Sequence, residues 1–148
     1  MIRMNPQQKE RAFALFFAAR KRKELEAFDA SEGVRLATGP EDVSLYALDE
    51  EIWASHAEQG AVLVGEVSES GAASIDVEIC PNWDQHATQW WDTAHRATNA
   101  PSLFRQLAES GPRQVTEAEA RTFEKWASTL SGWGVGASLE RTALFFRW

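Results

Sequence analysis

The clearest pattern of apolar and polar positions lies between residues 61 and 80. Residues 61–67, AVLVGEV, are apolar except for Gly65 and Glu66, as in a strand covered on both faces. SESG follows at 68–71 and is typical of a turn. From residue 73 to 80 the residues alternate, with one face formed by Ile75, Val77 and Ile79 and the other by Asp76, Glu78 and Cys80. This predicts a β-hairpin over 61–80, with Gly65 at a bulge or a close backbone approach.

Three segments have the periodicity of amphipathic helices. Asn5 can cap a helix that begins at Pro6, and apolar residues three and four apart extend the prediction over 6–28. Thr116 and Glu119 form a capping-box pattern, which predicts a helix over 117–130. Between them, the segment after Pro81 predicts a helix over 84–98.

Shorter patterns complete the expected elements. Residues 34–37 suit a short strand, and residues 43–48 suit a second strand or the start of a helix. Asp49 is placed to cap a short helix over 50–59 that ends at Gly60, where the acids 49–51 would meet the helix dipole. The tail, 142–148, predicts a last strand beside the hairpin.

Together these elements predict an α+β fold. A chain of 148 residues fits one globular domain, 1–148, and can bury a sizeable core. We expect a small, mainly antiparallel sheet centred on the 61–80 hairpin, with three to five helices packed on one face or at one end.

Composition places the chain among globular proteins. Hydrophobic residues make up 44% and charged residues 25%, which argues against disorder. No apolar run reaches the roughly 20 residues of a membrane-spanning helix, and the N-terminal residues lack the pattern of a secretory signal. The single cysteine, Cys80, cannot form an internal disulfide. We therefore expect a cytoplasmic protein.

Charge is distributed very unevenly. The net charge of −7 combines seven bases and one acid in residues 1–23 with sixteen acids and one base in residues 24–95. Nucleic acids and anionic membranes need a cationic surface, so neither is expected as a partner. The basic run 20–23 is expected on a solvated helix face, paired with acids elsewhere. Two interpretations of the acids stay open: a merely solvated surface, or a surface that docks a basic partner.

The function that fits this pattern is that of a non-enzymatic acidic module that binds a basic protein, in the manner of an inhibitor or a chaperone. Toxin-neutralising immunity proteins and small secretion chaperones have such compositions. The expected docking acids are Asp49, Glu50, Glu51, Glu66, Asp76 and Glu78. Trp83 and Trp133 are expected as aromatic anchors. Association into a homodimer stays open.

The alternative is a small hydrolase. Cys80 precedes a predicted helix start, where a thiol can have a lowered pKa, and Asp84 and His86 follow closely. Asp76 and Glu78 would lie roughly 6.5–7 Å apart on one strand face, a spacing that suits an acid/base pair or a divalent cation. The plain interpretations are an apolar filler at Cys80 and an acidic, solvent-facing strand.

No cofactor or resident metal is expected. His56, His86 and His95 lack the i,i+4 spacing of a helical metal site, and there is no second cysteine. The glycine-rich loop 132–136 follows a predicted helix and lacks the Lys and Ser/Thr of a phosphate loop. It is interpreted as a helix C-cap and turn.

Overall fold

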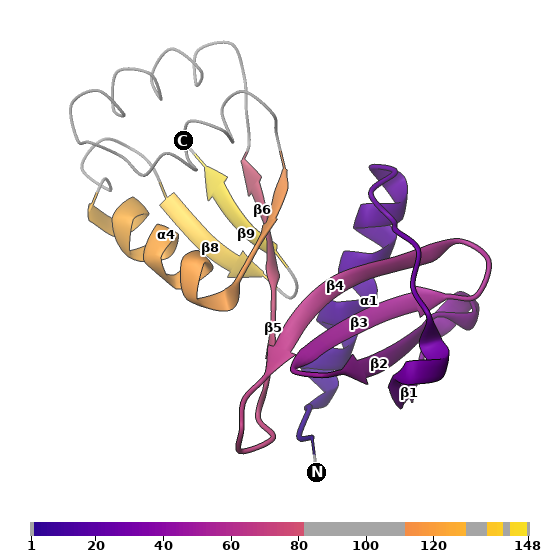
Figure 1. The fold of residues 1–148 in the computed structure, drawn as a ribbon. Coiled ribbons are helices and arrows are strands. Elements are labelled where there is room, and N and C mark those ends of the chain that lie inside the picture. The colour runs from indigo at the N-terminus through magenta and orange to yellow at the C-terminus, as the bar shows by residue number, and fades with distance from the viewer. Residues whose placement is uncertain (1, 82–111, 130–135, 141–142, 148) are drawn as a thin grey trace. The chain divides into compact units, whose positions relative to one another are not determined.

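A computed structural model describes residues 2–81, 112–129, 136–140 and 143–147 (Figure 1). Within it the chain divides into two compact units, Met1–Val77 and Glu78–Trp148. The expectation of one globular domain stays a prediction.

The first unit is a five-stranded antiparallel sheet with one α-helix. Its elements are α1 (Pro6–Lys21), the 3-10 turns η1 (Ala30–Glu32) and η2 (Pro40–Asp42), and the strands β1 (Val34–Thr38), β2 (Ser44–Leu48), β3 (Glu51–His56), β4 (Gly60–Val67) and β5 (Ala73–Ile75). The strands follow chain order across the sheet, β1-β2-β3-β4-β5, and every neighbouring pair is antiparallel. The predicted strand at 34–37 is thereby confirmed, and of the two interpretations left open for residues 43–48 the strand is the one that forms.

Helix α1 begins as predicted but ends seven residues early. Asn5 and Gln8 form a reciprocal capping box at its start. At its end Lys23 takes a left-handed conformation, φ 61°, and the Glu24 amide donates to the Ala19 carbonyl at 2.9 Å. That bond, with the Lys23 amide on the Arg20 carbonyl, is a Schellman motif, which stops a helix. The predicted helix over 6–28 was therefore wrong beyond Lys21.

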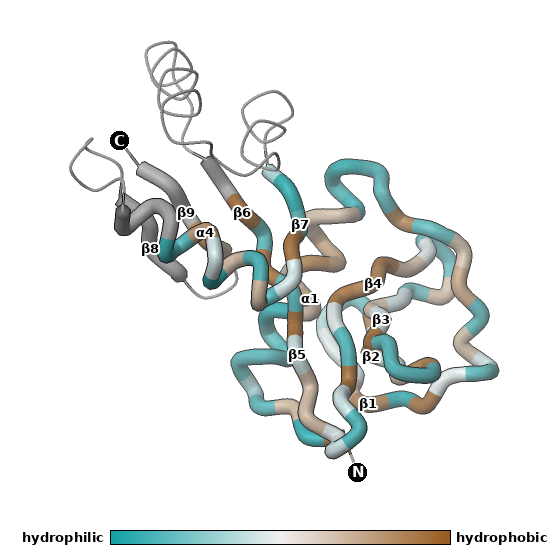
Figure 2. Tube along the Cα trace, turned by 60° about the vertical axis from the view of Figure 1, so that its left-hand side comes forward, coloured by the Kyte–Doolittle hydropathy of each residue, from teal (hydrophilic) through white to brown (hydrophobic). Residues whose placement is uncertain are grey.

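The core of the first unit lies between α1 and one face of the sheet. Its fully buried side chains come from the helix and from four strands or their flanks: Ala12, Leu15, Phe16, Val43, Leu45, Ile52, Ala54, Val64 and Ile75. Burying one of the Val, Leu, Ile or Phe side chains of this set contributes about 1.5–3 kcal/mol relative to leaving it exposed. The hydrophobic run of β4 stands out in Figure 2 as the brown stretch beside that label.

The segment predicted as a helix over 50–59 is strand β3. Asp49 does not cap a helix; with Glu50 it forms the two-residue turn between β2 and β3, at φ 56°. Ile52 and Ala54 are both fully buried, so the burial follows the period of two of a strand. As a helix, residues 50–59 would need an apolar face of their own to bury these side chains. As a strand, they form backbone hydrogen bonds with a neighbouring strand on each side.

The predicted hairpin forms, but at the edge of the sheet. Strands β4 and β5 pair antiparallel, and β5 is the last strand. Gly65 confirms its prediction: β4 is bulged there against β3, and a Cβ on Gly65 would lie 2.2 Å from the Ser74 carbonyl oxygen. The second half of the hairpin is divided at Asp76, because residues 77–81 belong to another sheet. The sheet is therefore centred on β3, not on 61–80.

The second unit contains a four-stranded mixed sheet and one described α-helix. Its elements are β6 (Val77–Pro81), β7 (Arg113–Val115), α4 (Glu117–Thr129), β8 (Gly136–Glu140) and β9 (Ala143–Arg147), with strand order β7-β6-β9-β8. The tail strand pairs with residues 78–81 as predicted, although in parallel, and β8 pairs with it antiparallel. Thr116 and Glu119 form the predicted capping box. Strands β7 and β8 were not predicted.

The architecture is α+β, as predicted, with fewer helices than expected. The described residues contain two α-helices where three to five were expected, and the predicted helix 84–98 lies outside the described residues. Helix α1 covers one face of its sheet, and α4 contacts β8 and β9. In the described part of the chain, no helix is long and apolar enough to cross a membrane.

Candidate binding surface on the five-stranded sheet

The five-stranded sheet presents a second face, opposite α1, that we call the outer face. On β3, Ile52 and Ala54 point into the core, so Glu51, Trp53 and Ser55 point to the outer face. Cross-strand register extends this face to the neighbouring strands, where Tyr46 pairs with Trp53 from β2 and Leu63 pairs with it from β4.

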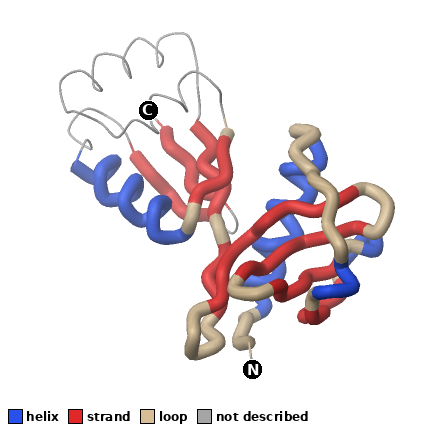
Figure 3. The backbone as a smooth tube through the Cα atoms, viewed as in Figure 1, coloured by secondary structure: helices blue, strands red, loops and turns tan. Residues whose placement is uncertain are grey.

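A segment of the chain crosses the outer face. Residues 25–31, which we call the strap, run from the end of α1 towards β1. Figure 3 shows the strap as a tan segment that ends in the blue turn η1 and passes one side of the strands while α1 lies on the other. Glu26 and Ala61 exchange two backbone hydrogen bonds of 2.8 Å, which fix the strap to β4. Gly60 is required beside that contact, because its φ is +113° and a Cβ there would lie 2.9 Å from the Glu26 carbonyl oxygen.

Three aromatic rings meet under the strap. Phe28 stacks on Trp53, with ring centroids 5.2 Å apart, and lies 5.9 Å from Tyr46. All three side chains remain partly exposed. The indole N–H of Trp53 is buried and has no acceptor among the described residues, so packing rather than a hydrogen bond holds this ring. Arg35 donates to the Tyr46 hydroxyl at 3.2 Å.

Four of the predicted docking acids lie together at one end of the outer face, which we call the acidic end: Asp49, Glu50, Glu51 and Glu66. Asp49 and Glu50 form the β2–β3 turn, and the Glu50 carbonyl accepts from the Val67 amide at 2.8 Å. Glu51 stands directly opposite Glu66 on the neighbouring strand. Within the described part of the chain, none of the four carboxylates forms an ion pair.

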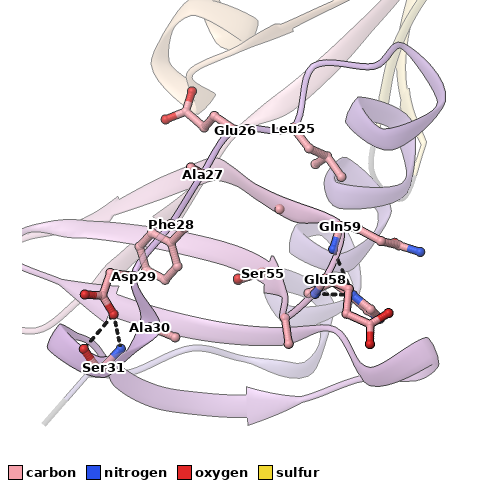
Figure 4. Close-up of a pocket in the computed structure, with 13 residues that line it drawn as sticks. Leu25, Glu26, Ala27, Phe28, Asp29, Ala30, Ser31, Ser55, Glu58 and Gln59 are labelled. Carbon is pink, nitrogen blue, oxygen red and sulfur yellow. Dashed lines mark hydrogen bonds between the residues drawn. The ribbon is translucent and has the colours of Figure 1, made fainter.

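At the other end of the outer face the strap and the β3–β4 turn enclose an open hollow of about 610 Å³. Figure 4 shows Ser55 beneath the strap, between Phe28 and Glu58. The turn is braced by His56, whose Nδ1 accepts from the Glu58 and Gln59 amides at 3.1 and 3.2 Å. Such a volume lies within the range of about 300–1,000 Å³ typical of ligand sites.

One carboxylate at the hollow has a shifted pKa. The Ser31 hydroxyl donates to Asp29 Oδ1 at 2.6 Å and the Ser31 amide donates at 3.0 Å. These bonds, the hydroxyl first, hold the pKa of Asp29 below the ordinary value for aspartate. Asp29 therefore stays ionised throughout the neutral range.

Of the other predicted docking and catalytic residues, the structure describes the side chains of Asp76 and Glu78. Asp76 lies between β5 and β6, its amide bonded to the Val64 carbonyl at 2.8 Å, and Glu78 lies in β6 of the second unit. Both are half-buried, while Ile75, Val77 and Ile79 are buried, so the predicted alternation is confirmed. The backbone of Cys80 lies in β6. The side chain of Cys80 and all of Trp83, Asp84, His86, His95 and Trp133 lie outside the described residues.

No metal centre is formed by the part of the chain that the structure describes, where no three His, Cys, Asp or Glu side chains are grouped to hold an ion. The described residues offer a surface with aromatic, acidic and concave parts.

Comparisons with known proteins add no family. No protein-family model matches the chain, and no curated protein or solved structure matches it either.

Sequence reasoning missed the three rings of the outer face. Phe28 was assigned to the helix core and Trp53 to a short helix. The cluster of rings could be predicted only if residues 51–56 were known to be a strand. Tyr46 and Trp53 are then cross-strand neighbours on the face away from α1.

Proposed function

We propose that the protein is a non-enzymatic binding module that docks a basic protein partner on the outer face of its five-stranded sheet. The acidic end supplies the electrostatic attraction, and the partly exposed rings of Trp53 and Tyr46 supply the apolar contact in place of the predicted anchors. Complementary charge raises the rate of encounter and the specificity of docking more than the final affinity. Buried aromatic residues commonly carry most of the binding energy at such an interface.

The observation that carries this proposal is the pairing of Glu51 with Glu66. Two like charges directly opposite each other in an antiparallel pair destabilise the sheet, by about 0.2–1 kcal/mol. Neither carboxylate has an ion-pair partner within the described residues. A basic side chain from a partner would relieve this repulsion, so the fold itself favours a cationic occupant at that position.

The charge of the surrounding surface agrees with this proposal. Beyond residue 23 the first unit carries thirteen acids and a single base, Arg35. Arg35 is engaged with Tyr46, both through its hydroxyl at 3.2 Å and over its ring at 5.7 Å. The bases of residues 1–23 lie on α1 and its flanks, and of these Arg20 reaches the β3–β4 turn at Gln59. Arg20 also pairs with Glu41 at 3.6 Å.

The test compares the wild-type chain with Glu66→Gln. The variant is expected to unfold at higher urea, because the repulsion from Glu51 is gone, by about 0.2–1 kcal/mol in unfolding free energy. The same variant is expected to retain less of the basic protein that the wild-type chain captures from a lysate of its host, and the capture is expected to weaken at high salt.

Glu69→Gln is the matched control, because Glu69 is an exposed acid in the turn between β4 and β5 and has no cross-strand partner acid. It changes the net charge equally and is expected to leave both stability and capture close to wild type. Equal loss of capture in the two variants would show that capture depends on the net charge of the protein and not on the position of Glu66. Capture that Glu66→Gln leaves unchanged would contradict the proposal.

A further inference from the structure

The hollow between the strap and the β3–β4 turn is separate from the acidic end and the rings that the proposed function uses. It lies at the end of the outer face opposite the acidic end, four residues along β3 from Glu51 to Ser55. Leu25 and Phe28 line it from the strap, and Ser55 lines it from β3 (Figure 4). The hollow is therefore lined by a mixture of apolar and polar side chains, with Leu25 and Phe28 as its larger apolar residues.

Both walls of the hollow are held in place independently. The strap is fixed by the two Glu26–Ala61 backbone bonds and by the stacking of Phe28 on Trp53. The turn is fixed by the two amide bonds to His56 and by Arg20, which donates to Gln59 Oε1 at 3.2 Å. A site whose walls are already ordered loses little entropy when it binds a ligand.

The charged Asp and Glu side chains that line the hollow are not matched by a lining Lys or Arg. Glu26, Asp29 and Glu58 line it, and no Lys or Arg is among the described lining residues. Figure 4 shows the three carboxylates on different sides of the hollow rather than converging on a point. They therefore act through their combined field and not as a chelating group. Arg20 reaches the rim at Gln59 but also pairs with Glu41, at 3.6 Å.

An occupant of matching chemistry has an apolar stem and a cationic head. We propose that the hollow receives an arginine side chain of the basic partner, with its methylenes against Leu25 and Phe28 and its guanidinium in the field of Glu26, Asp29 and Glu58. A long cationic side chain buries its stem and keeps its charge near water, which suits an open hollow with acids on its rim. A guanidinium is also less strongly hydrated than an ammonium and packs on aromatic rings. This inference rests on the proposed function for the identity of the partner.

The test needs no partner, only Nα-acetyl-arginine amide as the probe. Titrated into the full chain and followed by amide NMR, it is expected to shift the amide signals of Ser55, Gln59 and Gly60 in a saturable way. Nα-acetyl-citrulline amide, a neutral compound of nearly the same shape, is expected to bind at least about tenfold more weakly. Glu58→Gln is expected to weaken the arginine probe about two- to fivefold, as befits one exposed charge among three.

Two controls separate this inference from the proposed function. Glu69→Gln is expected to leave the binding of the probe unchanged, and so is Glu66→Gln, which should weaken only the whole partner. Citrulline binding as well as arginine, or an absence of saturable shifts at the three amides, would overturn the arginine site. Either result would leave the capture experiment with Glu66→Gln standing, so the two proposals fail separately.

Discussion

Single residues decide where the elements of this chain end. Lys23 is the clearest example, because it takes a left-handed conformation that glycine adopts without strain and lysine does not. The Schellman bonds of Glu24 and Lys23 hold it there and turn the chain away from α1 into the strap. Strap and hollow both depend on this one turn.

Replacing Lys23 with glycine should stabilise the protein. The left-handed strain is relieved, the unfolded chain gains some entropy, and the net gain is expected to be about 0.5–1 kcal/mol in urea unfolding. Lys21→Gly is the matched control, since Lys21 is the last residue of α1 and has no left-handed strain to relieve, so glycine there should lower stability by up to about 0.5–1 kcal/mol. Shifts in the same direction for both variants would contradict this account of the helix end.

Asp29 gives a prediction in acid. Because its folded pKa lies below its unfolded value, ionised Asp29 stabilises the fold above the unfolded pKa, and that contribution is lost as the pH falls through the folded pKa. Ser31→Ala removes the hydroxyl donor, so the pKa of Asp29 should rise towards the ordinary value and the stability should fall less steeply on acidification. NMR titration of the Asp29 carboxyl carbon measures the shift.

The control for this titration is Ser70→Ala, which removes an exposed serine that pairs only with its own turn at Ser68 and with Arg3. It should leave the pKa of Asp29 where it is. A pKa of Asp29 that Ser31→Ala does not move would show that the hydroxyl bond is not its main cause.

At the scale of elements, local sequence signals predicted where the two α-helices begin. They missed the features that depend on neighbouring elements. The capping patterns at Asn5 and Thr116 were both confirmed, because a cap is formed by residues three apart in the chain. The end of α1 was missed because its C-terminal signal is a lysine in place of the usual glycine. Strand β3 was missed because Asp49 and Gly60 also fit the two ends of a helix, and only the neighbouring strands decide between them.

The same limit applies to the candidate site. The acids 49–51 and Glu66 were chosen from the sequence as docking residues, but their assembly follows from the β3–β4 register, which local patterns do not contain. The rings of Phe28 and Trp53, and the hollow beside them, follow from the path of the strap across the sheet. That path is a tertiary feature, and the residues 25–31 carry no motif for it.

The strap depends on Phe28, and the variant Phe28→Ala tests this. We expect the unfolding free energy to fall by about 1–3 kcal/mol, less than for a fully buried ring, and the amides of Glu26 and Ala61 to exchange with solvent faster because their mutual bonds open locally. Phe13→Ala is the control, since Phe13 packs against the core side of the sheet. It should lower stability without selective exchange at Glu26 and Ala61. Full protection of these amides in Phe28→Ala would contradict the role of the ring.

At the scale of the molecule, the first unit separates its charges. One side of its sheet packs on a helix that, with its flanks, carries all of the unit's bases except Arg35, and the other side carries the acidic end, the aromatic rings and the hollow. Like charges brought together at one end of a sheet lower stability, and a fold keeps such an arrangement readily when a partner neutralises it. The central claim is therefore that the acidic end steers a basic protein onto the outer face.

The most direct test is the association rate of that captured partner, measured by stopped flow or surface binding between low and high salt. The wild-type rate constant is expected to fall steeply as salt rises, because screening at about 0.1 M already confines charge interactions to roughly 10 Å. Glu51→Gln/Glu66→Gln should associate more slowly at low salt and depend less on salt, while Glu69→Gln follows the wild type. A wild-type rate that does not change with ionic strength would contradict the account.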